Sequence, residues 1–530
     1  MWRVGGYNIS REALLAIRQG NNERVEHLVE GLVVALKQAR QLREAQDGGG
    51  FQTSVWDFAC AVQKLGKRPL GRHGPSFWDE VGSLVQEAAP SMTGREVAMF
   101  CNAYASGAPD RLSGSLGTAL GDRAADLAED LSAQDFTMIL TGLSKASSST
   151  EVPISKESLD RFASRARRLR LDPKYPSQAP MLLTAFARLR HSTDAELHGR
   201  LFRYAQSQWD TWDAQELAAL LNAFAKMGRR ARAGIPEEEW RSVAQRCAEL
   251  LPNADVQSIT LMSHGLVNVG AEPSWSSDFF VALEEKLCKR PMLSESLSPQ
   301  ALAMISHSLA RQRRPDGHLR EDFRVQGGPS DYQPLTKWPF EEYATRRLRD
   351  FTPQGLGLIL YASVRLQRGG RPFFATVAQQ LKRHGLEALA PPGLAMVVSA
   401  ASEAIASIGF SDPLRLLHDV APLCGAAADS MAPWQVMWIL TAYANACETR
   451  AKVLTTSKPP LIFSEDDATR LFLTSLSQRA AEVLADRNRR AAALRLAVRI
   501  AEAEGVATDL RQDLEELILG PLVVESETPT

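Results

Sequence analysis

A short helical pattern that recurs about every forty residues constrains the fold of this chain most strongly. One copy is QELAALLNAFAKMG, residues 215–228, in which the small residue Ala223 follows the large apolar Leu220 by three positions. Aligning the copies places Ala, Gly or Ser at ten equivalent positions: Ala61, Ala103, Gly142, Ala185, Ala223, Gly265, Ser308, Ala362, Ala401 and Ala442. The spacings between them run from 38 to 43 residues, with a single spacing of 54. A regular period near forty indicates a stack of helical units.

Every copy carries a large apolar residue three positions before the small one. These residues are Phe58, Phe100, Ile139, Leu182, Leu220, Met262, Ile305, Ile359, Val398 and Ile439. Residues three apart share one face of a helix, so a neighbouring helix can approach over the small side chain and pack beside the large one. One helix pair cannot bury such a face alone. We therefore predict an all-α fold, an α-solenoid of about ten two-helix repeats with helical caps.

The chain divides into three predicted regions. Residues 1–50 are expected to form N-terminal capping helices, residues 51–450 the helical-repeat array, and residues 451–530 C-terminal helices followed by a disordered tail. Second helices of the repeats are expected at 155–170, 193–208, 237–251 and 373–384. The single long spacing contains a Gly-, Pro- and charge-rich stretch, 313–334, that is typical of an exposed loop.

Composition and charge exclude several classes of protein. The formal net charge is −1, which argues against a strongly polycationic nucleic-acid binder but allows a local basic face. No run of eighteen apolar residues is present, so we expect no membrane partner. The six cysteines form no C-x-x-C pair and are interpreted as reduced, buried residues.

The sequence contains no recognisable catalytic or metal-binding motif. P-loop, G-x-G-x-x-G, H-E-x-x-H and G-x-S-x-G patterns are all absent. His264 and His307 occupy equivalent positions in successive repeats, which we expect to lie too far apart to share one metal ion. We therefore expect a protein that is not an enzyme, with no catalytic residues, no metal and no cofactors.

Two further series of residues share another face of the repeated helix. The basic series lies three positions after the small residue and comprises Lys64, Ser106, Lys145, Arg188, Lys226, Asn268, Arg311, Arg365, Ala404 and Asn445. The polar series lies four positions earlier and comprises Cys60, Asn102, Thr141, Thr184, Asn222, His264, His307, Tyr361, Ala400 and Thr441. Positions four apart are neighbours on a helix surface. A curved stack would align them in a continuous row.

Two interpretations of these series remain open. A cation in the last turn of a helix is favoured by the helix dipole by about 0.3–1 kcal/mol, which alone accounts for part of the basic series. Alternatively, the row follows single-stranded RNA, with cations on phosphates and polar groups on bases. Arginine-rich segments at 161–170 and 487–499 would add positive charge. The candidate RNA-binding residues are Lys145, Arg188, Asn222, Lys226, His264, Asn268, His307, Arg311, Tyr361 and Arg365.

The repeated motif, seen as QELAALLNAFAK, resembles the helical repeats of FAST-kinase-like and RAP-domain organellar proteins, the heptatricopeptide and octotricopeptide repeat proteins. The resemblance covers residues 51–450. It implies organellar RNA processing, stability or translation, in the mitochondrial matrix or alternatively in a plastid, with single-stranded organellar RNA or rRNA as partner. Ribosomal or other organellar proteins are further implied partners. No RAP domain is visible after residue 450, so no catalytic activity is carried over.

A second function stays open beside RNA binding. Concave solenoid surfaces bind peptides as readily as nucleic acid. The near-neutral net charge favours a protein–protein scaffold or a structural subunit of an organellar ribosome. A continuous positive groove along the two series would favour RNA, and scattered side chains would favour the scaffold.

Overall fold

Every regular element of the part of the chain that the structure describes is a helix, and the helices alternate in two roles. This computed structural model describes residue 59, residues 74–504 apart from 113, 147–153, 173, 176, 190–194, 228–233, 271–272, 290–295, 313–339, 409–410, 454–465 and 485–486, and a few later positions. It forms two compact units, residues 1–243 with 268–270, and 244–267 with 271–530.

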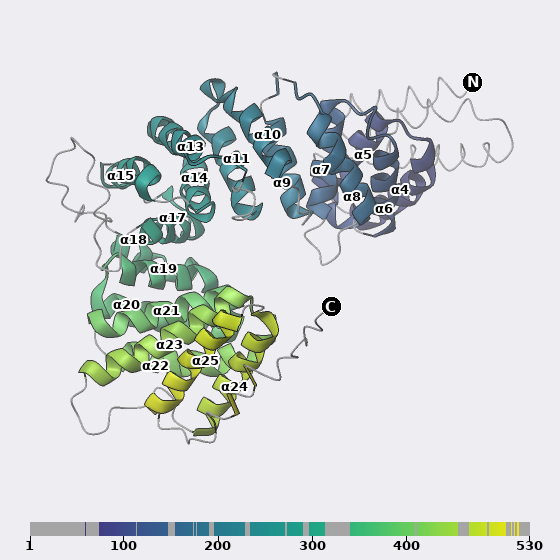
Figure 1. Cartoon of the computed structure of the whole chain (residues 1–530). Coiled ribbons are helices and arrows are strands. Elements are labelled where there is room, and N and C mark those ends of the chain that lie inside the picture. Colours follow the sequence, from purple (N-terminus) through teal and green to yellow (C-terminus); the bar gives the residue numbers. More distant parts are fainter. Residues whose placement is uncertain are drawn as a thin grey trace, which may run out of the picture. The chain divides into compact units, whose positions relative to one another are not determined.

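The helices that carry the recurring pattern are called A helices here. They are α5 (Gly94–Gly107), α7 (Ala133–Ala146), α9 (Gln178–Arg188), α11 (Ala214–Met227), α14 (Val256–Asn268), α17 (Pro299–Gln312), α19 (Pro353–Arg365), α21 (Pro391–Ile408) and α23 (Pro433–Val453). In the first unit α5, α7, α9 and α11 pack one on the next, and in the second unit α17, α19, α21 and α23 do the same (Figure 1).

The intervening helices are called B helices. They are α4 (Gly74–Ala88), α6 (Ser115–Asp126), α8 (Lys156–Arg168), α10 (Ala195–Gln206), α13 (Glu237–Leu250), α15 (Pro273–Lys289), α18 (Phe340–Arg346), α20 (Gly370–His384), α22 (Ser411–Ala426) and α24 (Asp466–Val483). They form a second row in each unit, with α4, α6, α8 and α10 in contact in the first and α20, α22 and α24 in the second. The four predicted second helices are confirmed as α8, α10, α13 and α20. The predicted all-α solenoid is therefore confirmed.

The predicted seam between A helices is buried at every described copy. The nine small residues from Ala103 to Ala442 are all buried, and among the alanines and Ser308 the most exposed is Ala442 at 5 %. The nine large partners from Phe100 to Ile439 are at most 1 % exposed. The first copy, Phe58 and Ala61, lies outside the described residues. The recurring large–small pair thus forms the contact between successive A helices.

The residue after the small one points toward the B row instead. Tyr104 follows Ala103, and its hydroxyl donates a hydrogen bond of 3.0 Å to the main-chain oxygen of Trp78 in α4. Tyr443 follows Ala442, and its hydroxyl donates a bond of 2.8 Å to the main-chain oxygen of Leu417 in α22. The two bonds have the same separation in sequence, so they are equivalent contacts in distant repeats.

Short 3₁₀ turns connect B helices to the A helices that follow. Examples are Ala89–Ser91 before α5 and Trp209–Thr211 before α11. The A helices then start at capping residues: the Thr93 main-chain amide donates to the Glu96 carboxylate at 2.8 Å, and the Glu216 amide donates to Asp213 Oδ1 at 3.0 Å. Such caps satisfy helix amides that lack partners. They set where each repeat begins.

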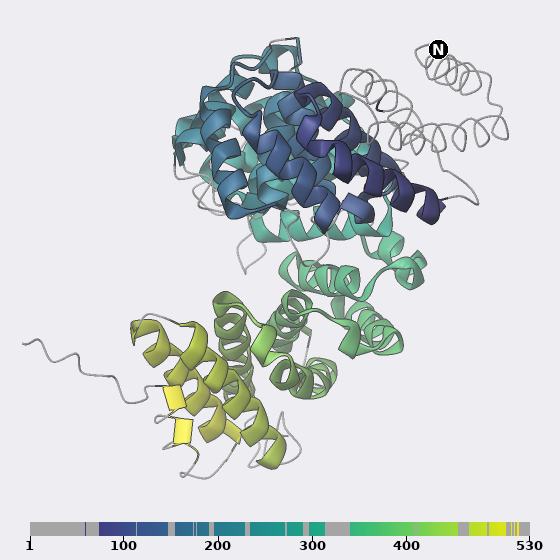
Figure 2. The same cartoon turned by 90° about the vertical axis from the view of Figure 1, so that its right-hand side faces the viewer.

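The second unit does not end its packing at residue 450. Helix α24 lies against α22, and α25 (Arg487–Glu504) lies against α23, so the C-terminal helices extend both rows (Figure 2). Arg450 on α23 and Glu504 on α25 form a fully buried ion pair of 2.6 Å. The predicted N-terminal helices at 1–50 and the loop at 313–334 lie outside the described residues.

Candidate nucleic-acid interface

In the first unit, the two series follow the A helices as the sequence predicts. The cations Lys145, Arg188 and Lys226 lie in the last turns of α7, α9 and α11, and all three are exposed. Thr184 and Asn222, one turn earlier on α9 and α11, are half-buried. On these helices the hydrogen-bonding side chains are therefore more buried than the cationic side chains.

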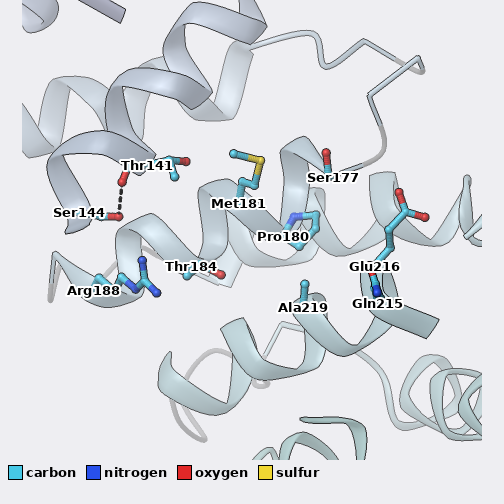
Figure 3. A pocket seen from close by; sticks show the side chains of 10 residues that line it. All are labelled: Thr141, Ser144, Ser177, Pro180, Met181, Thr184, Arg188, Gln215, Glu216 and Ala219. Carbon is cyan, nitrogen blue, oxygen red and sulfur yellow. Dashed lines mark hydrogen bonds between the residues drawn. The ribbon is translucent and has the colours of Figure 1, made fainter. Parts of the chain in front are cut away.

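A depression of about 240 Å³ opens between α7, α9 and α11. Thr141, Thr184 and Arg188 from the two series line it, together with Met181 and Ala219 (Figure 3). Ser144, Ser177, Pro180, Gln215 and Glu216 complete the lining. Polar atoms and apolar surface therefore meet in one shallow site, in a mixture that suits a planar ligand with polar edges.

The floor of this depression contains an unsatisfied hydroxyl. Thr141 Oγ1 is buried and has no hydrogen-bond partner among the described residues. The neighbouring Ser144 hydroxyl donates to the main-chain oxygen of Thr141 at 2.9 Å and leaves the Thr141 side chain unused. Buried polar atoms nearly always have a partner, so this hydroxyl, on a residue that lines the depression, is an exception.

Arg188 and Lys226 repel each other across adjacent A helices. The pKa of Lys226 is lowered from its ordinary value, first because the amine is partly removed from water and second because the Arg188 charge lies near. Two like charges held side by side in this way are stabilised by an anion placed between them. This pair would therefore be stabilised by a bound anion.

The candidate residues of the second unit are less accessible. His307 and Tyr361 are only 6 % and 4 % exposed, and their rings lie 5.6 Å apart. Burial and the nearby charges of Arg311, His264 and Arg365 lower the pKa of His307 to about 3, so this imidazole is neutral. His307 and Tyr361 therefore support the surface more than they form it.

The remaining candidates of the second half of the series lie closer to solvent. Arg311, in the last turn of α17, is exposed, and His264 and Asn268 on α14 are half-buried. Arg365 lies 3.2 Å from the Glu403 carboxylate of α21 and 5.6 Å from the Tyr361 ring centre. Its charge is thus partly neutralised by the protein itself.

The series is interrupted at α21, where Ala400 and Ala404 occupy both positions and are completely buried. Aromatic side chains from the two neighbouring A helices approach each other here: Tyr361 of α19 and Trp438 of α23 have ring centres 6.0 Å apart. Trp438 and its neighbour Trp434 were not among the predicted site residues. Their spacing of four on one helix was the available signal.

Three arginines of the segment 161–170 contact residues elsewhere in the first unit. Arg161 pairs with Asp126 at 3.0 Å and Arg168 pairs with Glu129 at 2.6 Å. Arg165 donates to the main-chain oxygen of Leu131 at 3.0 Å, in the loop before α7. These guanidinium groups are therefore used within the protein, so they add less free positive charge than the sequence suggested.

The Arg165 contact belongs to a set that recurs through both units. In each case a cation on or just after a B helix donates to a main-chain oxygen at the end of the preceding B helix or in the loop that follows it. The set comprises Arg123 to Met92, Arg165 to Leu131, Arg200 to Leu169, Lys286 to Leu251 and Ala254, Arg347 to Leu297, and Arg479 to Met431. Charged hydrogen bonds of this kind contribute about 1.5–3 kcal/mol each.

The described residues contain no group of three or more His, Cys, Asp or Glu side chains placed to hold a metal ion. Of the five described cysteines, all free thiols, Cys101, Cys247, Cys424 and Cys447 are buried as predicted, whereas Cys288 is half-buried. Cys60 lies outside the described residues. Across the same described residues, no helix is both long enough and apolar enough to cross a bilayer.

Comparison with known proteins gives no family. No protein-family model matches the chain, and no curated protein sequence matches it. Among solved structures, it is similar to a chain of a homology model of the full-length AP-3 complex in an intermediate open conformation (12 % identity, 93 % of each chain covered, TM-score 0.35). It is also similar to a circular tandem repeat protein with novel repeat topology and enhanced subunit contact surfaces (15 % identity, 98 % of each chain covered, TM-score 0.16).

Proposed function

We propose that this protein binds single-stranded RNA without catalysing a reaction on it, through the polar and basic series of its A helices. The observation that carries the proposal is that Arg188, which lines the depression between α7, α9 and α11, lies close enough to Lys226 for its charge to lower the pKa of that amine. A phosphodiester between the two cations would relieve their repulsion, and a base in the depression would find Thr141 and Thr184 at its edge.

The cellular setting of the proposal comes from the sequence resemblance alone. The repeats resemble those of FAST-kinase-like and RAP-type organellar proteins, which favours a role in mitochondrial or plastid RNA processing, stability or translation. The RNA would be an organellar transcript or rRNA, and ribosomal proteins would be further partners.

A binding titration at two salt concentrations tests the proposal. Polarisation of a labelled single-stranded RNA should rise with added protein, and affinity should fall with salt because phosphate contacts release counterions. Replacing both cations (Arg188→Gln with Lys226→Gln) should weaken binding and reduce the salt slope by about 0.7, the value for one phosphate contact on a single strand. Lys156→Gln with Arg203→Gln is the matched control, since it removes two exposed charges from B helices.

The competing function is a protein–protein scaffold or a structural subunit of an organellar ribosome. The net charge of −1 and the many arginines already paired within the fold favour it. If the protein binds no RNA at low salt, or if the control double variant loses as much affinity as Arg188→Gln with Lys226→Gln, RNA binding through this surface is rejected. Either result would favour the scaffold.

A further inference from the structure

Four aromatic rings follow one another across three A helices of the second unit. His307 of α17 lies 5.6 Å from Tyr361 of α19, which lies 6.0 Å from Trp438 of α23, which lies 5.7 Å from Trp434. The planes are tilted by 46°, 82° and 48°. Aromatic pairs at such distances and angles attract one another beyond simple burial. We call these four residues the aromatic row.

The row depends on the interruption at α21. Tyr361 and Trp438 belong to helices on either side of α21, and their rings meet in a repeat where Ala400 and Ala404 leave no long side chain in the series. At these two positions other repeats carry pairs such as Asn222 and Lys226. The aromatic row thus replaces the polar and basic series in this part of the second unit.

Burial falls along the row from one end to the other. His307 and Tyr361 are almost fully buried, Trp438 is half-buried, and Trp434 is 50 % exposed in the first turn of α23. Among the described residues, only Tyr175 and Leu471 are other large hydrophobic side chains with comparable exposure. The Trp434 ring therefore contacts the Trp438 ring and is also half exposed to solvent, so it is already positioned to stack on a ligand.

Charges near the row favour an anionic partner over a cationic one. Arg365 lies over the Tyr361 ring, and both Arg311 and Arg365 lower the pKa of Tyr361, although burial, which raises it, dominates. The carboxylate that acts on the same ring is Glu403, which is paired with Arg365. Cations beside exposed aromatic rings are the usual composition of surfaces that bind single-stranded nucleic acid.

We propose that Trp434, supported by Trp438, stacks on a nucleobase of single-stranded RNA bound to the second unit, with the exposed Arg311 near its phosphates. The proposal rests on the RNA binding proposed above and adds a base contact where the polar series is interrupted. Stacking of this kind tolerates any base, because every base has a flat face. The site would therefore add affinity without sequence preference.

The test compares two labelled oligonucleotides of equal length, a single-stranded RNA and an abasic oligomer with the same number of phosphates. Trp434→Ala should weaken binding of the RNA about fivefold or more and leave the abasic oligomer unchanged. Trp434→Phe should restore most of the lost affinity, because it keeps a flat ring. Leu471→Ala, which removes an exposed apolar side chain from the B helix α24, is the matched control and should change neither affinity.

The outcomes separate the two proposals. If the unmodified protein binds neither oligonucleotide, the proposed function fails and this inference fails with it. If both are bound but Trp434→Ala changes neither affinity, or weakens both equally, the stacking inference alone is overturned. A selective loss for the RNA with rescue by Trp434→Phe supports the stacking site.

Discussion

Gly142 of α7 lies against the main chain of Cys101 in α5, so closely that no side chain fits between them. A Cβ atom placed on Gly142 would lie 2.6 Å from the Cys101 carbonyl oxygen and 2.8 Å from Cys101 Cβ. Main-chain atoms of a helix cannot move aside without breaking its hydrogen bonds. The glycine therefore sets how closely the two A helices approach in this repeat.

Gly142→Ala is expected to destabilise the protein. An added methyl forces α5 and α7 apart and costs about 1–3 kcal/mol, which exceeds the gain of about 1 kcal/mol from better helix propensity. Urea unfolding followed by circular dichroism would measure the change. Gly425→Ala in α22 is the control, because its Cβ would lie 3.6 Å from its nearest neighbour, Phe472 Cα. The control should be neutral or slightly stabilising. Equal stability of the two variants would contradict the close contact at Gly142.

The ionisation of Lys226 should respond to Arg188. Removal of the neighbouring charge in Arg188→Gln takes away one of the two causes that lower the pKa of Lys226, so this pKa should rise toward its ordinary value. Titration of the lysine amine by NMR, with selective labelling, would measure the change. Because burial is the larger cause, we expect the rise to be partial. No rise at all would show that the two side chains do not interact.

The lowered pKa of Lys226 also determines whether its contribution to stability rises or falls with pH. A lysine whose folded-state pKa lies below its unfolded value binds its proton more weakly in the folded protein. The resulting loss of stability is fully present below the pKa of the folded state and disappears as the pH rises to the pKa of the unfolded state. The contribution of Lys226 to stability should therefore increase with pH in that alkaline window. In Arg188→Gln this increase should be smaller.

Two ion pairs between α23 and α25 differ in burial and should differ in energy. The Arg450 and Glu504 side chains are 2 % and 1 % exposed, whereas the Glu448 and Arg499 side chains are 44 % and 46 % exposed. Glu504→Gln leaves the Arg450 guanidinium buried without a counter-charge and should cost about 3–5 kcal/mol. Glu448→Gln should cost less than about 1 kcal/mol, because its pair is screened by water. Thermal unfolding of both variants would measure the difference.

A further contact makes the Arg450 prediction specific to helix docking. Arg450 Nη2 also donates to the main-chain oxygen of Ala503 at 2.8 Å, so it binds both the side chain and the main chain at the end of α25. Proteolysis should therefore release the segment after residue 453 faster in Glu504→Gln than in Glu448→Gln. The same cleavage rate in both would argue against Arg450 as the residue that holds α25.

The sequence predicted the contacts that depend on neighbouring positions of one helix. Ala223 and Leu220 lie three residues apart on one face, and their burial follows from the helical period once several copies are compared. The basic series was predicted for the same reason, and Lys145, Arg188 and Lys226 lie in the last turns of their helices. Whether these cations bind RNA stays a prediction.

Contacts between residues far apart in sequence were not predictable in this way. The bond from Tyr104 to Trp78 and the pairing of Arg161 with Asp126 depend on how two helices align along their length. Side-chain spacing on a single helix contains no information about that alignment. For this reason the arginine-rich segment 161–170 suggested an open positive surface, while the structure uses its guanidinium groups as internal contacts.

The sequence by itself determined the all-α class, the repeat length and the seam, because each depends on a periodicity that one chain repeats many times. Tertiary structure alone decided which polar residues remain accessible. Thr184 and Asn222 are half-buried on adjacent helices of the first unit, while His307 and Tyr361, at the equivalent positions of later repeats, are buried. The physical reason is that accessibility depends on the side chains of neighbouring helices, such as the tryptophans of α23, and not on the residue's own place in the repeat.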